Sequence, residues 1–155
     1  MRKAILTLII VMSIVGLAGA QEYKTGIGLR GGFSSGLTIK HFKNQKAAFE
    51  GLLTTRWQGF GITGLYEIHN RAFEVDHLNW YYGGGAHIGF FNGNYAYWGA
   101  NGTEYTVIGI DGILGLEYTF SEIPINLGID WKPALNLVGY SGFWSEGGIS
   151  VRYVF

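Results

Sequence analysis

The carboxy-terminal end of this chain alternates between apolar residues and small or polar residues. In an extended strand, side chains alternate between two faces, so residues 147–155 would form one apolar face and one polar face. The apolar face would carry Ile149, Val151, Tyr153 and Phe155. The polar face would carry Gly148, Ser150 and Arg152. A strand of this kind would lie between an apolar and a polar environment.

The same alternation recurs along the chain and predicts eight strands. We expect them at residues 23–31, 37–43, 48–57, 60–70, 78–91, 106–120, 125–132 and 143–155. Turn-forming sequences separate the runs, among them Asn92-Gly93 and Asn101-Gly102. No run has the 3.6-residue period and the caps of a helix. The predicted fold is all-β: an eight-stranded antiparallel up-and-down transmembrane β-barrel.

The amino-terminus has the three parts of a signal peptide. Arg2 and Lys3 precede an apolar stretch at residues 4–17, and Ala18-Gly19-Ala20 supplies small residues for cleavage. A membrane-anchoring helix is the alternative, but the stretch is shorter than the roughly 20 residues needed to cross a bilayer. We therefore expect a signal peptide at residues 1–20, a barrel domain at 21–155, and export to the bacterial outer membrane.

Composition limits the other classes of function. The chain has no cysteine, so no disulfide stabilises it. Without Arg2 and Lys3, 11 − 2 = 9 basic residues face 11 acidic ones, a net charge of −2. Binding to nucleic acid needs a clustered basic surface, and we expect no such partner. The sequence also predicts no cofactor and no metal site, because the four histidines form no ligand cluster.

Sorting the predicted strands by face separates apolar from charged residues. One face collects Leu29, Ile39, Leu114 and similar side chains, with aromatic residues, Tyr23 and Trp57 among them, mainly near strand ends, as in membrane barrels. The other face collects six cations and six anions beside many glycines. These charged residues are Lys24, Arg30, Lys40, Arg56, Lys132, Arg152, Glu50, Glu67, Asp111, Glu117, Asp130 and Glu146. We expect them to form a paired network in a closed lumen, which eight strands leave just wide enough for side chains.

A soluble lipocalin-like barrel is the alternative fold, with apolar residues inside and charges outside. Alternation alone does not separate the two. The membrane barrel is favoured by aromatic residues at strand ends, by glycines on the charged face and by the terminal Phe155.

The connections between strands predict which segments reach the cell surface. With both termini in the periplasm, the odd-numbered connections face outside, and outside loops are the longer ones. The segments at 92–105 and 133–142 would then be surface loops. The first contains Tyr95, Tyr97 and Trp98, which either pack on the barrel rim or contact an extracellular ligand.

Two motifs have weaker interpretations. Residues 26–31 match the dinucleotide pattern G-x-G-x-x-G, but a turn and a strand follow instead of the required helix. His69 and His87 fall on the polar face of adjacent predicted strands, where they would meet in an interior hydrogen-bond network.

An enzyme remains the second hypothesis: an outer-membrane lipid A acyl hydrolase or transferase. A catalytic set could combine Ser145 or Ser150 with His69 or His87 and Glu67. The chain has no G-x-S-x-G nucleophile elbow, and residue types alone do not fix geometry. We therefore name no catalytic residue.

The leader, the eight alternating runs and residues 151–155 resemble small OmpX/OmpA-type outer-membrane barrels. Residues 28–33 and 129–134 resemble those of uncharacterised Bacteroidetes outer-membrane β-barrel proteins. This resemblance implies a monomeric envelope protein in contact with outer-membrane lipid, with a structural or surface-interaction role. It also implies that Tyr153 and Phe155 are the signal recognised by the barrel-assembly machinery.

Overall fold

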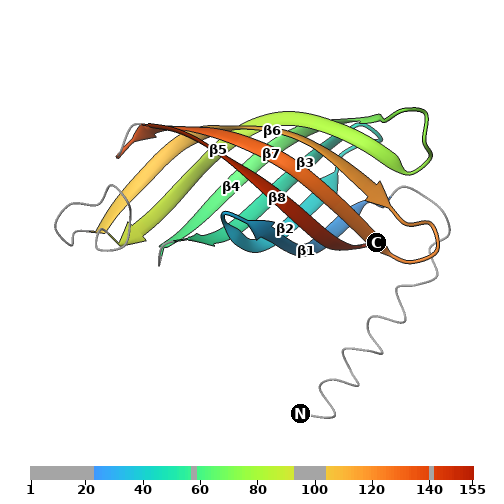
Figure 1. Cartoon of the computed structure of the whole chain (residues 1–155), viewed down its shortest axis with the longest axis horizontal. Helices are drawn as coiled ribbons and strands as arrows, with labels where there is room; N and C mark the ends of the chain where they lie inside the picture. Colours follow the sequence, from blue (N-terminus) through green and yellow to red (C-terminus); the bar gives the residue numbers. More distant parts are fainter. Residues whose placement is uncertain (1–22, 57–58, 93–103, 140–141) are drawn as a thin grey trace, which may run out of the picture.

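The computed structural model describes residues 23–56, 59–92, 104–139 and 142–155. Eight antiparallel strands close into one barrel, in which each strand pairs with the next and β8 pairs with β1 (Figure 1). The strands are β1 (Thr25–Gly32), β2 (Ser35–Phe42), β3 (Ala47–Arg56), β4 (Gly59–Arg71), β5 (Leu78–Asn92), β6 (Glu104–Thr119), β7 (Ile125–Val138) and β8 (Gly142–Val154). This confirms the predicted fold class. The predicted signal peptide lies outside the described residues.

No helix in the described part of the chain is both long and apolar enough to cross a membrane.

The two ends of the barrel differ in what they contain. At the turn end lie the start of β1, the terminal Phe155 and the connections 43–46, 72–77 and 120–124. At the loop end lie the connection 33–34 and the ends of the strands that flank residues 57–58, 93–103 and 140–141. At the turn end, backbone hydrogen bonds of 2.9 Å join Thr25 and Phe155 in both directions. The first and last residues of the barrel are thereby tied together.

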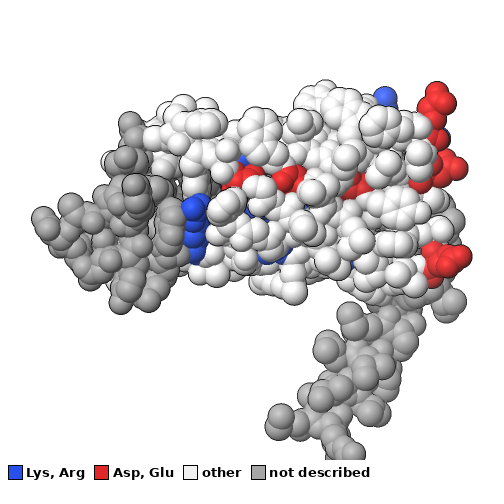
Figure 2. Space-filling model, viewed as in Figure 1, with Lys and Arg blue, Asp and Glu red and all other residues white. Residues whose placement is uncertain are grey.

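The alternation places apolar side chains on the outer wall and charged side chains inside. Leu29 is 65% exposed and Ile149 is 62% exposed, whereas Lys40 and Arg152 are fully buried. On the face drawn in Figure 2 most of the outer wall is uncharged, charged atoms show in places between the white side chains, and the acidic residues that protrude gather at one end. A soluble barrel with an apolar interior would have the opposite arrangement.

The seventh strand is longer than predicted. The sequence predicted a surface loop at 133–142, but β7 continues to Val138 and β8 begins at Gly142. Pro133 fits within β7 because the ladder to β6 is interrupted there: Asp111 pairs with Ala134 and Leu114 with Trp131, with no pair between them. A proline in a strand needs such a site, since it has no N–H to donate.

The start of the first strand also differs from the prediction. Tyr23 was expected on the outer wall and Lys24 in the lumen. Instead Tyr23 is buried and Lys24 is exposed. Alternation does not extend to these residues because regular β structure begins only at Thr25. Trp57, also expected on the outer wall, lies outside the described residues.

Candidate functional site in the barrel interior

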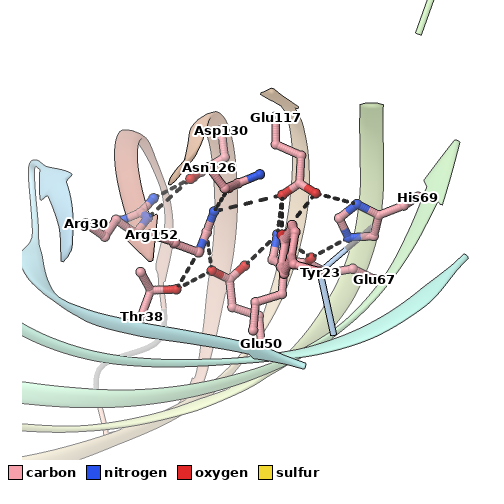
Figure 3. A network of polar contacts seen from close by, with 11 residues as sticks. Tyr23, Arg30, Thr38, Glu50, Glu67, His69, Glu117, Asn126, Asp130 and Arg152 are labelled. Atoms are coloured by element: carbon pink, nitrogen blue, oxygen red, sulfur yellow. Dashed lines mark hydrogen bonds and ion pairs between the residues drawn. The ribbon is translucent and has the colours of Figure 1, made fainter. Parts of the chain in front are cut away.

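Lys40 is the centre of a network of charges near the turn end of the lumen. Its partners Glu50, Glu67 and Glu117 are labelled in Figure 3. Its Nζ lies 2.8 Å from Glu67 Oε2, 3.2 Å from Glu117 Oε2 and 3.4 Å from Glu50 Oε2. It also lies 4.0 Å from the centroid of the Tyr81 ring. These partners come from β3, β4, β5 and β6, so one ammonium on β2 joins strands on both sides of the lumen. We call this group, with Arg152 and His69, the turn-end network.

Arg152 on β8 supplies the second permanent cation of the turn-end network. It forms an ion pair with Glu50 and lies 3.9 Å from Glu117. Its other donors reach Thr38 Oγ1 and Asn126 Oδ1, both at 3.1 Å. The planar guanidinium has five N–H donors in a fixed arrangement, which suits it to several acceptors at once.

His69 on β4 contacts two carboxylates with its two ring nitrogens. Nε2 lies 3.0 Å from Glu67 Oε2, and Nδ1 lies 3.3 Å from Glu117 Oε1, an ion-pair distance without aligned hydrogen-bond geometry. A neutral imidazole donates from only one nitrogen, so two facing carboxylates favour the doubly protonated ring. His69 then balances the network, because Glu50, Glu67 and Glu117 outnumber the two permanent cations by one.

A second group, the loop-end network, lies toward the other end of the lumen. Arg30 pairs with Asp130 at 2.6 Å and with Glu146 at 3.3 Å. Lys132 pairs with Asp111 at 2.9 Å and with Glu146 at 3.4 Å. His87 completes it, with Nδ1 at 2.7 Å from Asp111 Oδ2 and Nε2 at 2.9 Å from Asn136 Oδ1. Here too, three carboxylates face two permanent cations and one histidine.

Beside these polar groups, β3, β4, β5 and β6 contribute apolar side chains to the lumen. Leu52, Leu65, Tyr81 and Ile113 form a buried cluster. Their positions share the inward face with the charged residues, which is why alternation alone did not single them out. The cluster fills the part of the lumen that the long charged side chains leave.

The structure buries most of the charged residues that the sequence assigned to the lumen. These are Arg30, Lys40, Glu50, Glu67, Asp111, Glu117, Asp130, Lys132, Glu146 and Arg152. Two members of the predicted set differ. Lys24 is exposed, and Arg56 is only half-buried near the loop end, with its guanidinium carbon 5.0 Å from the centroid of the Trp144 ring.

Several polar residues of the interior were not predicted. Tyr23 donates a hydrogen bond to Glu117 at 3.2 Å, Thr38 donates one to Glu50 at 2.5 Å, and Ser34 donates one to Glu146 at 2.8 Å. For Thr38, the signal in the sequence was its even spacing from Lys40 on the inward face. For Ser34, in a turn, and Tyr23, before the strand, periodicity offers no signal.

The residues considered for catalysis are not brought together. The Ser145 side chain is exposed on the outer wall, and the buried Ser150 hydroxyl has no hydrogen-bond partner among the described residues. His69 and His87 do not meet as expected, because His69 pairs in register with Tyr81 and His87 with Thr63. Nor do the described residues contain a group of three or more histidines and carboxylates that could hold a metal ion.

Two further predicted residues, Tyr153 and Phe155, lie at the turn end of the barrel. Tyr153 is half-buried and Phe155 is 47% exposed, with their rings 6.2 Å apart at the turn end. Tyr95, Tyr97 and Trp98 lie outside the described residues.

Comparison with known proteins supports the architecture. No protein-family model matches the sequence, and no curated protein sequence is significantly similar to it. Among solved structures, the chain is similar to the N-terminal β-barrel domain of OprF from Pseudomonas aeruginosa, with a TM-score of 0.64 and 13% sequence identity. The match covers 86% of this chain and 100% of that domain. At this identity the likeness concerns the fold alone, which is that of a small closed eight-stranded barrel.

Proposed function

We propose that the chain is an outer-membrane protein whose closed barrel serves as a scaffold for segments at the loop end, which contact the cell's surroundings. The observation that carries this proposal is the inversion of the barrel, with apolar side chains on the outer wall and paired charges in the lumen. Exposing so many apolar side chains to water is unfavourable, whereas the hydrocarbon layer of a membrane would stabilise the same wall.

The distribution of outward aromatic residues supports the same environment. Trp80, Tyr118 and Tyr153 lie on the half of the wall near the turn end, whereas Phe60 and Phe90 lie near the loop end. Aliphatic residues such as Leu29 and Ile110 occupy the wall between them. Tyrosine and tryptophan prefer the level of lipid headgroups, so the band near the turn end would mark one edge of the hydrocarbon layer.

The packed lumen supports a scaffold rather than a diffusion pore. The turn-end network, the loop-end network and the apolar cluster around Leu52 together occupy the lumen. Eight strands enclose a space that side chains can fill, without a continuous water channel. We therefore propose a monomeric barrel with a structural or surface-interaction role, exported through residues 1–20 and assembled through Tyr153 and Phe155.

A matched pair of variants tests the membrane environment of the wall. Leu114 is 47% exposed in β6, and Ile123 is 50% exposed in the turn between β6 and β7. Arginine at position 114 would cost roughly 2–4 kcal/mol if that position lies near the bilayer midplane, and much less at position 123. We expect Leu114→Arg to block folding into phosphatidylcholine vesicles and Ile123→Arg to fold normally, as measured by heat-modifiable mobility on gels.

Equal folding of the two variants would show that the wall does not face hydrocarbon. Cell fractionation of the wild-type chain supplies the second test, since recovery outside the outer-membrane fraction would contradict the location. Single-channel recording from the reconstituted barrel tests closure: we expect no steady ion conductance, and a reproducible open channel would contradict the scaffold role.

A further inference from the structure

Three exposed lysines gather on one side of the turn end. Lys24 precedes β1, and Lys43 and Lys46 are the first and last residues of the connection between β2 and β3. The carbonyl oxygen of Lys24 accepts a 2.8 Å hydrogen bond from the backbone N–H of Phe42, so Lys24 lies beside the end of β2. The three lysines therefore form one patch over β1, β2 and β3, which we call the basic flank.

The connection that carries Lys43 and Lys46 is held in a fixed shape. Asn44 Oδ1 accepts hydrogen bonds from the backbone N–H groups of Lys46 at 2.9 Å and of Ala47 at 2.8 Å. The N–H of Lys43 donates to the carbonyl oxygen of Ala47 at 2.8 Å. Asparagine side chains commonly fix tight turns by such contacts to the backbone. Only the two lysine side chains therefore need to become ordered when a partner binds.

The charge of the basic flank is not neutralised within the part of the chain that the structure describes. None of the three lysines forms an ion pair with another described residue. The carboxylate of Phe155 lies near Lys24, whose backbone N–H donates to it at 3.1 Å. With that carboxylate counted, two net positive charges remain among the described residues. Glu22, two positions before Lys24, lies outside them.

The other side of the turn end is acidic. Glu74 and Asp76 are exposed in the connection between β4 and β5, and Glu122 is exposed in the connection between β6 and β7. Arg71, an exposed cation on this side, already pairs with Asp76 at 3.4 Å. The acidic groups that protrude in Figure 2 lie at the end where Figure 1 marks the C-terminus. An anionic partner would therefore be attracted to one side of the turn end and repelled from the other.

The basic flank continues into the apolar outer wall. On β2 and just after it, Ile39, His41 and Lys43 are all exposed at every second position, so they share the outward face. Ile39 is 49% exposed, and Phe49 on the neighbouring β3 is 51% exposed. At the usual rise of a strand, Lys43 lies roughly 13 Å beyond Ile39. The lysines are thus placed at the edge of the wall that we propose to face hydrocarbon.

We infer that the basic flank binds anionic phospholipids of the leaflet at the turn end, with their phosphates at the lysines and their acyl chains against Ile39 and Phe49. This inference rests on the proposed outer-membrane location. Lysine suits the role because its long apolar stem can lie along the wall while its ammonium reaches the level of the phosphates. An acidic protein would find the same charge, but it would make no use of the apolar wall directly beside it.

Competition between two lipids tests this inference. The detergent-folded barrel is mixed with equal amounts of phosphatidylglycerol, which is anionic, and phosphatidylcholine, which has no net charge. Native mass spectrometry then counts the lipids that stay bound. We expect the barrel to retain phosphatidylglycerol about tenfold more often than phosphatidylcholine. Equal retention of the two lipids would overturn the inference, and it is the result that a surface for an acidic protein would give.

Variants locate the preference on the molecule. The triple variant Lys24→Gln, Lys43→Gln and Lys46→Gln removes the charges of the basic flank, and we expect it to retain the two lipids about equally. Lys43→Gln and Arg71→Gln form a matched pair, since each removes one exposed positive charge from the turn end. We expect Lys43→Gln to lower the preference for phosphatidylglycerol and Arg71→Gln to leave it unchanged. A preference that persists in the triple variant would place the lipid elsewhere and overturn the inference.

Folding into phosphatidylcholine vesicles separates this inference from the proposed function. Because the three lysines are exposed and unpaired among the described residues, we expect the triple variant to fold there as the wild-type barrel does, as measured by heat-modifiable mobility on gels. A wild-type barrel that folds in these vesicles but shows no preference for phosphatidylglycerol would overturn this inference and leave the membrane location intact. A wild-type chain that does not fold into vesicles would overturn both.

Discussion

Arg30 on β1 and Asp130 on β7 form an ion pair across β8, which lies between their strands. The guanidinium makes two contacts with the carboxylate: Nη2 to Oδ1 at 2.6 Å and Nε to Oδ2 at 3.3 Å. The arginine side chain reaches β7 by passing over Gly148 of β8. A Cβ built at Gly148 would lie 2.5 Å from the guanidinium carbon of Arg30. The ion pair in this geometry therefore requires glycine at position 148.

Replacing Gly148 should therefore disrupt the ion pair. We expect Gly148→Ala to lower the free energy of unfolding by about 1–3 kcal/mol, since the added methyl forces the guanidinium away from Asp130. Gly147→Ala is the matched control, because Gly147 faces outward and its nearest contact would be the Asp130 carbonyl oxygen at 3.7 Å. Urea unfolding in vesicles measures both variants, and equal stabilities would argue against the close approach.

Arg152 should be among the most costly charges to remove. Replacing it with leucine leaves Glu50 buried with Lys40, 3.4 Å away, as its only ion-pair partner among the described residues. Removing one partner of a buried pair costs about 3–5 kcal/mol, whereas an exposed pair contributes at most about 1 kcal/mol. Arg71→Leu is the control, because Arg71 and Asp76 form a 3.4 Å pair at the surface. We expect the melting temperature to fall markedly for Arg152→Leu and little for Arg71→Leu; an unchanged value for both would mean that the interior pairs add nothing.

The balance of charges around His69 predicts coupling between two substitutions. His69→Gln leaves three carboxylates facing two cations, so this variant should be less stable than the wild-type barrel. Glu67→Gln removes one carboxylate and should restore part of the loss in the His69→Gln background. A double-mutant cycle on urea unfolding measures the coupling, which we expect at about 0.5–3 kcal/mol. Purely additive effects would indicate that His69 is neutral in the folded barrel.

The fold was predictable because a single periodicity runs through the whole chain. A two-residue period assigns every side chain to a face, and one apolar face per strand leaves few architectures open. Arg30, Lys132 and Arg152 were each assigned to the lumen because they are an even number of residues from glycines on the same predicted strand. The assignment worked because they lie well inside regular strands.

The errors lie where the period is broken. Pro133 indicated the end of a strand, yet the interrupted ladder to β6 accommodates it, and only tertiary pairing determines that. Tyr23 and Lys24 precede the first residue of β1. The bend there, and not the alternation of a strand, decides where their side chains point.

The contacts within the lumen could not be predicted from the sequence, for a different reason. The two-residue period assigned twelve charged residues to one face, but it does not say which charges meet across the barrel. Lys40 reaches Glu67 and Glu117, whereas Arg30 reaches Asp130. These choices depend on strand tilt and on depth along the axis. A cavity at the loop end, lined in part by Trp144, likewise takes its walls from six strands.

The two ends of the barrel should be accessible from opposite sides of the outer membrane. Because the chain has no cysteine, a single introduced cysteine reports one position. Ser121 is exposed at the turn end, and Asn101 lies in the sequence between β5 and β6, whose facing ends are at the loop end. Long connections face outside in such barrels, so we expect a membrane-impermeant maleimide to label Asn101→Cys on intact cells and Ser121→Cys only after the outer membrane is opened. The reverse pattern would place the loop end, with its cavity, in the periplasm, and labelling of both on intact cells would show that the barrel does not separate the two compartments.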